Sequence, residues 1–281
     1  SLCSHLKLIP RILMKIFLEI LGDFVELPEG PKRIVSLAPD ITDALFRLGL
    51  GDRVVGVSLY CNRPRDKTSK LPRVGAYLNV LWDRLNNLEP DLVFLTTGAQ
   101  RKLALEVLNR GFPAAVLPLP NSVFGILENL RKVGLITGKL EIAENLTIEL
   151  IDVLNSIKET NVMARVYYEI DLGGEITAGG PSYITNALRI IGLENVYSFK
   201  LESYFKPKDE ETLSLKPDLI IYEPKPERKY SEEDIRRNLR GRFGDIPAII
   251  TEPDFLAHYG PSLIDEVLPK LKRNLEKFLQ R

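Results

Sequence analysis

Residues 122–160 constrain the fold most, because this long stretch contains no proline and only the glycines at 125, 134 and 138. In its second half, residues 138–161, apolar side chains recur at spacings of three and four, which places them on one face of a helix. They are Ala143, Leu146, Leu150, Val153, Leu154 and Ile157. Charged residues fill the other faces. The pattern predicts one long helix in the middle of the chain.

Two similar segments flank this helical stretch. Residues 85–97 and 213–224 each contain a helix end, a Pro-Asp pair and then an apolar run. A proline disfavours helical conformation at the residue before it, and a continuous apolar run suits a strand of a parallel sheet that is buried on both faces. We therefore expect two similar α/β lobes joined by one helical spine.

Short apolar runs alternate with helical patterns on both sides of the spine, which indicates mostly parallel sheets with right-handed crossovers. The predicted fold class is α/β, with two similar lobes of mostly parallel sheets joined by one long helix and a ligand cleft between the lobes. The expected domains are an N-terminal extension with a short hairpin (1–30), an N-terminal lobe (31–121), a linking helical spine (122–161) and a C-terminal lobe (162–281).

The composition excludes some functional classes. The chain has 281 residues, a formal net charge of zero and a pI of about 6.8, whereas nucleic-acid-binding domains are normally basic. No apolar run reaches the roughly 18 residues of a membrane span. Glutamine, cysteine and methionine are scarce while Lys, Glu and Arg are abundant, a balance typical of proteins from hot environments.

The N-terminal region leaves two questions open. Residues 1–13 are apolar and basic, and Met14 is a plausible natural start. Lys15 and Glu19 interrupt the apolar region, so no complete signal peptide is visible; a signal either has been removed or never existed. Cys3 and Cys61 have no metal-binding spacing. We expect two unrelated thiols, with a disulfide as the alternative.

Aromatic residues collect in the loops that should follow the strands, where parallel α/β sheets bind ligands. Aromatic rings bury a large area at little conformational cost and suit a broad, flat ligand. Any single loop tyrosine is more simply explained by packing, but the group favours a cleft. The candidate ligand-binding residues are Tyr60, Tyr77, Tyr183, Tyr204, Phe205, Phe255, His258 and Tyr259.

Two acidic residues occupy matching places in the duplicated segments. Asp83 and Glu210 each lie in the first turn of the helix that precedes a Pro-Asp pair. The helix dipole favours an acid there, so capping alone is one explanation. The other is that one carboxylate from each lobe binds arginines of a partner.

Residues 178–182 (AGGPS) form a Gly-rich turn between a strand and a helix, and such turns can hold an anion. The turn matches neither the GxGxxG dinucleotide-binding motif nor the P-loop, so a tight turn that shapes the cleft is the favoured interpretation. No catalytic arrangement of Ser, His, Asp or Cys is visible, and we predict no metal site and no cofactor.

Four segments of the chain form a recognisable set: residues 33–64 (RIVSLAPDITDALFRLGLGDRVVGVSLYCNRP), 71–77 (LPRVGAY), 88–95 (LEPDLVFL) and 215–222 (LKPDLIIY). Together they resemble the class III solute-binding proteins of ABC importers, the cobalamin- and iron-siderophore-binding receptors. The resemblance implies two α/β lobes joined by a rigid helix, a small-molecule ligand held between them without chemistry, and delivery to an ABC permease dimer. It also implies a monomer outside the cytoplasm, at the cell surface or in the periplasm.

The resemblance carries over to individual residues. Asp83 and Glu210 match the acids that engage arginines on the permease dimer, although Asp83 stands where Glu is usual. The positions that match corrinoid contacts in cobalamin-binding members are Tyr60, Tyr77, Tyr204 and Phe255. Cobalamin binders carry Trp at two of these, Tyr77 and Phe255, so the ligand stays open among a corrinoid, a ferric siderophore and haem.

Two other classes stay open. One is a nucleotide-binding enzyme that uses the turn at 178–182. The other is an intracellular ligand or metal carrier, or an interaction protein, of the same fold.

Overall fold

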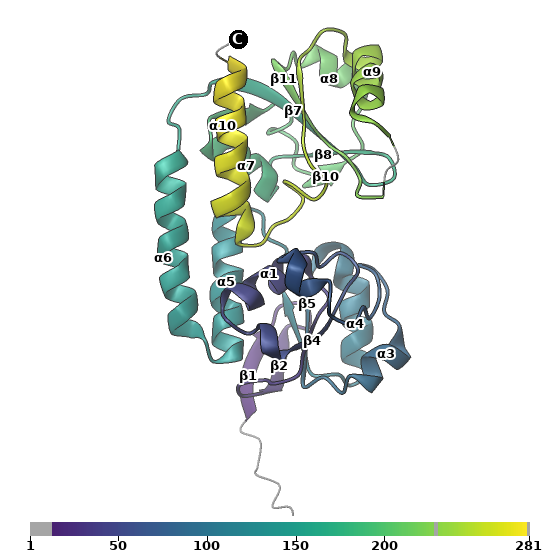
Figure 1. Cartoon of the computed structure of the whole chain (residues 1–281), viewed down its shortest axis with the longest axis vertical. Helices are drawn as coiled ribbons and strands as arrows, with labels where there is room; N and C mark the ends of the chain where they lie inside the picture. Colours follow the sequence, from purple (N-terminus) through teal and green to yellow (C-terminus); the bar gives the residue numbers. More distant parts are fainter. Residues whose placement is uncertain (1–12, 228–229, 280–281) are drawn as a thin grey trace, which may run out of the picture. The chain divides into compact units, whose positions relative to one another are not determined.

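The computed structural model describes residues 13–227 and 230–279 (Figure 1). The chain forms two compact units. The first runs through Leu119 and also includes Arg131–Ala143, and the second comprises Pro120–Leu130 and the described chain from Glu144 onward. Strands and helices are interspersed along the chain in both units, so the predicted α/β class is confirmed. No helix in the described residues is long and apolar enough to cross a membrane.

The first unit begins with an antiparallel hairpin of β1 (Leu13–Leu18) and β2 (Asp23–Pro28), in which Leu18 pairs with Asp23 next to the turn. Its main sheet is parallel throughout, in the order β4-β3-β5-β6. These strands are β3 (Ile34–Ser36), β4 (Val54–Val57), β5 (Leu92–Thr96) and β6 (Ala114–Leu117). The helices are α1 (Pro39–Arg47), α2 (Arg65–Thr68), α3 (Trp82–Asn87) and α4 (Arg101–Asn109), with 3-10 turns η1 (Gly51–Arg53) and η2 (Gly98–Gln100).

The second unit has a mixed sheet in the order β10-β8-β7-β11-β12, with β9 paired to β7. The strands are β7 (Ala164–Asp171), β8 (Glu175–Ala178), β9 (Leu193–Asn195), β10 (Tyr204–Phe205), β11 (Leu219–Glu223) and β12 (Ala248–Ile250). The pairs β7-β8 and β8-β10 are antiparallel, whereas β11 pairs in parallel with both neighbours. The helices are α7 (Tyr183–Ile190), α8 (Asp209–Ser214), α9 (Glu232–Phe243) and α10 (Leu268–Leu279), preceded by the π-turn η3 (Leu263–Val267).

The long helix predicted over residues 138–161 is confirmed as α6 (Leu140–Ile157), and the first half of the linking segment forms a separate helix, α5 (Val123–Thr137), so the segment contains two helices (Figure 1). The cause is Gly138, whose φ of 73° ends α5, because a residue in that conformation cannot continue a right-handed helix. A Cβ built on Gly134 would lie 2.4 Å from the Cβ of Ala143, so α5 and α6 approach closely there. Each helix has residues in both units.

The two duplicated segments build the same joint between a short helix and a buried strand. In the first unit, Arg33 Nη2 donates to the carbonyl of Leu88 at the end of α3, at 2.6 Å. The Asp91 carboxylate accepts from the backbone N–H of Arg33 at 2.8 Å and of Lys32 at 2.9 Å. The aspartate of the Pro-Asp pair therefore fixes the entry of a neighbouring strand.

The second unit repeats this joint with different residues. Arg165 Nη1 donates to the carbonyl of Leu215 at the end of α8, at 2.7 Å, and Asp218 accepts from the N–H of Arg165 at 2.8 Å. The residue before each proline has a positive φ, 45° at Glu89 and 52° at Lys216. The sequence similarity of the two segments thus reflects one structure used twice.

Candidate ligand-binding and docking residues

The candidate ligand-binding residues of the first unit lie in two loops after β4. The side chain of Arg73 ties the first loop, which carries Tyr60. Its Nη1 donates to the carbonyls of Ser58 at 2.7 Å and Cys61 at 2.9 Å, and its Nη2 donates to that of Thr68 at 3.1 Å. One guanidinium group therefore binds three carbonyls of the loop. Tyr60, in the same loop, is half-buried.

Cys61 points into the core beneath this loop. The residue is fully buried, and its Sγ lies 3.2 Å from Ser58 Oγ. Burial raises the pKa of the thiol above its ordinary value, which disfavours the reactive thiolate. Cys3, the other residue of the possible pair, lies outside the described residues.

Gln100 ties the second loop, which carries Tyr77. Its Nε2 donates to the carbonyls of Leu37, after β3, and of Tyr77, both at 2.9 Å. Its Oε1 accepts from the N–H of Thr96 at 3.0 Å and from the Thr96 hydroxyl at 3.2 Å. Gln100 is fully buried, and a buried amide with satisfied donors and acceptor holds its partners in one arrangement. Tyr77 is thereby fixed beside the carboxyl ends of β3 and β5.

In the second unit, Glu223 holds the loop after β12. Its carboxylate accepts from the backbone N–H groups of Phe255 at 2.7 Å, Leu256 at 2.9 Å and Ala257 at 3.2 Å. The hydroxyl of Tyr168 donates to it at 2.9 Å. Burial raises the pKa of Glu223 to about 7, against the lowering effect of these donors. The loop that carries Phe255, His258 and Tyr259 therefore rests on one buried carboxyl group.

The other candidate residues of the second unit differ in exposure. Tyr183 and His258 are almost fully buried, at 2% and 1%, and Tyr259 is 9% exposed. The rings of Tyr183 and Tyr259 lie 5.4 Å apart, and the Tyr183 hydroxyl donates to the Leu256 carbonyl at 2.7 Å. These contacts bring Tyr183 and Tyr259 together with the Glu223-bound loop.

Tyr204 and Phe205 form the short strand β10. Tyr204 is 37% exposed, and its hydroxyl accepts a hydrogen bond from Ser182 at 3.1 Å. Phe205 is half-buried and packs edge-on against Tyr197 with ring centroids 5.1 Å apart. A ligand role for any of the eight residues stays a prediction.

The turn at residues 178–182 is already occupied by its own chain. The N–H of Gly179 donates to the carbonyl of Ser203 at 3.0 Å, and that of Gly180 to the carbonyl of Lys200 at 2.8 Å. A Cβ on Gly179 would lie 1.9 Å from the carbonyl oxygen of Glu202. The glycines therefore permit close packing of two segments, and their N–H groups are not presented to an anion.

The acids at matching places have the same local position. Asp83 is the second residue of α3 and Glu210 the second residue of α8, and each helix has six residues. Both side chains are exposed. Neither helix has a side-chain cap at its N-cap residue. The two carboxylates are thus presented to solvent by equivalent elements, while their role in docking stays a prediction.

Sequence reasoning missed the buried groups that hold the loops, because Arg73, Gln100 and Glu223 were not assigned this role. Asp40 follows β3, is 4% exposed and has one carboxyl oxygen without a hydrogen-bond partner in the described structure. Burial raises its pKa to about 8. A usable signal for Glu223 was an acid that directly ends an apolar strand.

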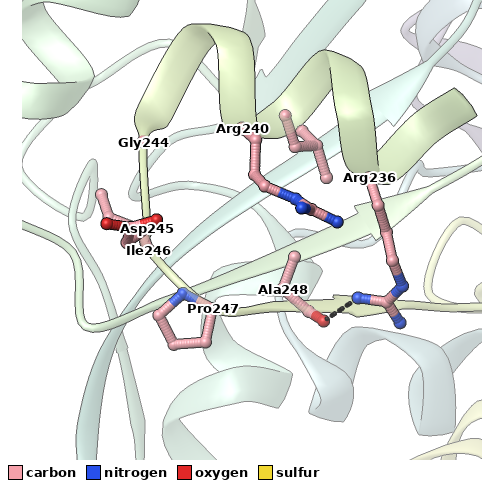
Figure 2. Close-up of a pocket in the computed structure, with 8 residues that line it drawn as sticks. Arg236, Arg240, Gly244, Asp245, Ile246, Pro247 and Ala248 are labelled. Carbon is pink, nitrogen blue, oxygen red and sulfur yellow. Dashed lines mark hydrogen bonds between the residues drawn. The ribbon is translucent and has the colours of Figure 1, made fainter. Parts of the chain in front are cut away.

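Figure 2 shows a separate cavity of about 200 Å³ in the second unit, where the chain passes from α9 to the start of β12. Arg236 donates there to the carbonyl of Ala248 at 3.1 Å, and Arg240 projects from α9. None of the predicted ligand residues lines this cavity. The described residues contain no cluster of His, Cys, Asp and Glu that could hold a metal ion.

Curated proteins of similar sequence are binding proteins. A vitamin B12-binding protein of Vibrio campbellii is 25% identical over 196 residues, which cover 68% of this chain and 71% of that protein. An uncharacterized ABC transporter substrate-binding lipoprotein of Bacillus subtilis, YvrC, is 25% identical over 259 residues, which cover 86% of this chain and 80% of that protein.

Solved structures share the fold. The petrobactin-binding protein YclQ of Bacillus subtilis has a TM-score of 0.79 at 14% identity, with 95% of this chain and 99% of that chain covered. The periplasmic heme-binding protein RhuT of Roseiflexus has a TM-score of 0.75 at 22% identity, with 89% and 100% covered. The profile of the periplasmic binding protein family matches residues 34–252. The chain therefore belongs to the periplasmic binding protein family, as its resemblance to solute-binding proteins predicts.

Proposed function

We propose that this protein is the substrate-binding component of an ABC importer and that it binds a corrinoid, a ferric siderophore or haem. Family membership supports a binding role, and the similar curated proteins include a vitamin B12-binding protein and an ABC substrate-binding lipoprotein. Proteins of the same fold bind heme and petrobactin. On this proposal the protein acts as a monomer outside the cytoplasm.

The observation that supports ligand binding best is the way the aromatic loops are held. Arg73, Gln100 and Glu223 each fix a loop that carries predicted ligand residues. All these loops follow carboxyl ends of parallel strands, where α/β folds bind ligands. Loops fixed before binding lose little conformational entropy when the ligand arrives. We propose that residues of both units contact one ligand.

The ligand test is absorbance titration with cyanocobalamin, haemin and a ferric catecholate siderophore. One of these should bind with a spectral change, and replacing Tyr60 and Tyr77 with Ala should weaken that binding by roughly 1–3 kcal/mol per ring, as for buried aromatic contacts. Tyr230→Ala, at an exposed tyrosine outside these loops, is the matched control. Failure of all three compounds to bind would remove this ligand class.

Docking to the permease is the second part of the proposal. We propose that Asp83 and Glu210 bind basic residues of an ABC permease, because both are exposed at the same place in equivalent helices. Charge-assisted hydrogen bonds contribute about 1.5–3 kcal/mol each. Replacing both with Ala should weaken permease binding at least about tenfold while ligand affinity stays unchanged.

The matched control for docking replaces two other exposed acids, Asp52 and Asp245, with Ala and so removes the same charge. Equal effects of the two double variants would mean that general charge, not docking, is responsible. If Asp83 and Glu210 only cap their helices, each Ala costs up to about 1 kcal/mol of stability and permease binding does not change.

A further inference from the structure

The first turn of α8 carries three acidic residues, and two of them are paired. Asp209 accepts from Arg242 Nε at 3.0 Å and from its Nη2 at 2.8 Å. Glu211 forms an ion pair with Lys200 at 2.9 Å. Within the described part of the chain, Glu210 has neither an ion pair nor a side-chain hydrogen bond. The pairing leaves a single carboxylate of this turn available to a partner.

Arg242 is itself anchored in the core of the second unit. Its two Nη atoms each donate to the carboxylate of Glu169 on β7 at 2.8 Å, and the Glu169 side chain is 1% exposed. The hydroxyl of Tyr167 also donates to Glu169. Burial alone would lower the pKa of Arg242, but the bonds to Asp209 and Glu169 raise it above its ordinary value. Asp209 is therefore connected through a permanent cation to the central strand.

The first unit holds the equivalent position by different chemistry. Trp82 is the first residue of α3, as Asp209 is the first residue of α8. The guanidinium carbon of Arg110 lies 3.9 Å from the centroid of the Trp82 ring, and Phe112 stacks with the ring at 6.3 Å. Arg242 belongs to α9 and Arg110 follows the last residue of α4. In both units, therefore, an arginine from another part of the chain contacts the residue that directly precedes the exposed acid.

Such anchors matter because α3 and α8 are short. A helix of six residues is marginal by itself, and neither one has a side-chain cap at its N-cap residue. A carboxylate on a fraying turn would have to be ordered each time it bound a partner, which costs affinity. Anchoring the preceding residue keeps the acid in one place before binding.

We propose that Arg242 and Arg110 are positioning residues for docking: each fixes the first residue of a short helix, and so presents Glu210 or Asp83 to a basic residue of an ABC permease. The inference rests on the docking role proposed above. Arg242 and Arg110 therefore influence docking only through Glu210 and Asp83, respectively.

The test in the second unit compares two variants that each remove one negative charge from the same turn. Asp209→Ala breaks the contact with Arg242 but leaves the Arg242–Glu169 pair, whereas Glu211→Ala breaks only the pair with Lys200. The probe is an ABC permease in lipid nanodiscs that binds the unmodified protein. Asp209→Ala should weaken this binding by about three- to tenfold more than Glu211→Ala, a range typical of coupling between neighbouring residues. Equal effects would overturn the proposal.

A second measurement separates this inference from the docking role itself. In a Glu210→Ala background, Asp209→Ala should cause no further loss, because the residue that it positions is gone. If Glu210→Ala alone leaves permease binding unchanged, the docking role fails and the inference fails with it. If Glu210→Ala weakens binding but the Asp209 effect persists in its background, docking stands and positioning is overturned. Unfolding midpoints confirm that each variant is folded.

The first unit allows the same comparison. Arg110 also pairs with Glu106 at 3.3 Å, so Glu106→Ala removes that pair and leaves the contact with Trp82. Arg110→Ala should weaken permease binding and Glu106→Ala should not. Arg110→Lys should restore part of the loss, because a lysine also attracts the face of an aromatic ring. Equal binding by all three variants would overturn the assignment of Arg110.

Discussion

Asp40 and Glu223 are buried carboxyl groups whose surroundings differ. One oxygen of Asp40 has no hydrogen-bond partner in the described structure, whereas Glu223 accepts from three backbone N–H groups and a tyrosine hydroxyl. Burial raises the pKa of both, to about 8 for Asp40 and about 7 for Glu223. The four donors around Glu223 favour its charged form and so limit the rise of its pKa.

Asp40→Asn should change stability in a pH-dependent way. The folded protein binds more protons than the unfolded chain between the ordinary pKa of 3.8 and the raised value of about 8. The contribution of Asp40 to stability is therefore full at low pH and is lost as the pH rises through about 8. Asparagine cannot ionise. The variant should match the unmodified protein near pH 4 and exceed it above pH 8 by on the order of a few kcal/mol.

Urea unfolding at the two pH values checks this prediction. If the variant and the unmodified protein differ in free energy of unfolding by the same amount at both pH values, the pKa of Asp40 is not raised.

Tyr168→Phe removes one donor from Glu223 without changing the shape of the core. Loss of that hydrogen bond should raise the pKa of Glu223 further above about 7, because the bond favours the carboxylate. The free energy of unfolding falls as the pH rises toward the pKa of Glu223. In the variant, this fall should continue to a higher pH than in the unmodified protein. Above pH 8 the variant should be destabilised by about 1.5–3 kcal/mol, the value of a hydrogen bond to a charged group.

Thermal unfolding across a pH series measures the Tyr168→Phe effect. An unshifted pH profile would mean that Tyr168 does not influence the ionisation of Glu223.

At the scale of elements, α5 and α6 pack closely where Gly134 faces Ala143. Gly134→Ala would place a methyl group 2.4 Å from the Cβ of Ala143, so the helices must separate. We expect a loss of about 1–3 kcal/mol, as for overpacked cores. The control is Gly241→Ala in α9, where the added methyl meets nothing within 4 Å and should stabilise by about 0.5–1 kcal/mol.

Urea unfolding of the two glycine variants gives both values. Stabilisation by Gly134→Ala would show that α5 and α6 do not pack closely at this point.

The sequence predicts those elements whose signals are local. Pro-Asp followed by an apolar run locates β5 and β11, and the spacing of apolar residues locates α6. It misses β9 and β10, because strands of three and two residues carry no periodicity. The break between α5 and α6 depends on one glycine conformation, which the composition of the segment does not reveal.

The candidate site is predicted less completely, for the same physical reason. Aromatic residues in loops, such as Tyr60 and Tyr77, can be recognised from the sequence of the loops alone. The groups that hold those loops act across long sequence separations, as Gln100 does over the 63 residues to Leu37. Only the folded sheet brings such partners together, so their roles cannot be derived from local pattern.

At the scale of the whole molecule, the chain continues from one unit to the other through α5 and α6, each of which has residues in both. Helices resist bending more than extended linkers do. We therefore expect only a small change in the radius of gyration when cyanocobalamin or haemin, whichever binds, is added. X-ray scattering with and without the compound measures this, and a contraction like that of hinge-closing receptors would contradict it.

The repeated joint offers a way to adjust the isoelectric point without disturbing the fold. Residues 88–91 and 215–218 differ only in that Glu89 stands where Lys216 does, with φ values of 45° and 52°. The same backbone conformation thus accommodates either charge on an exposed side chain. Glu89→Lys would move the formal net charge from zero to +2, and Lys216→Glu would move it to −2. Because a protein without net charge is prone to self-association, either exchange should improve solubility near pH 7.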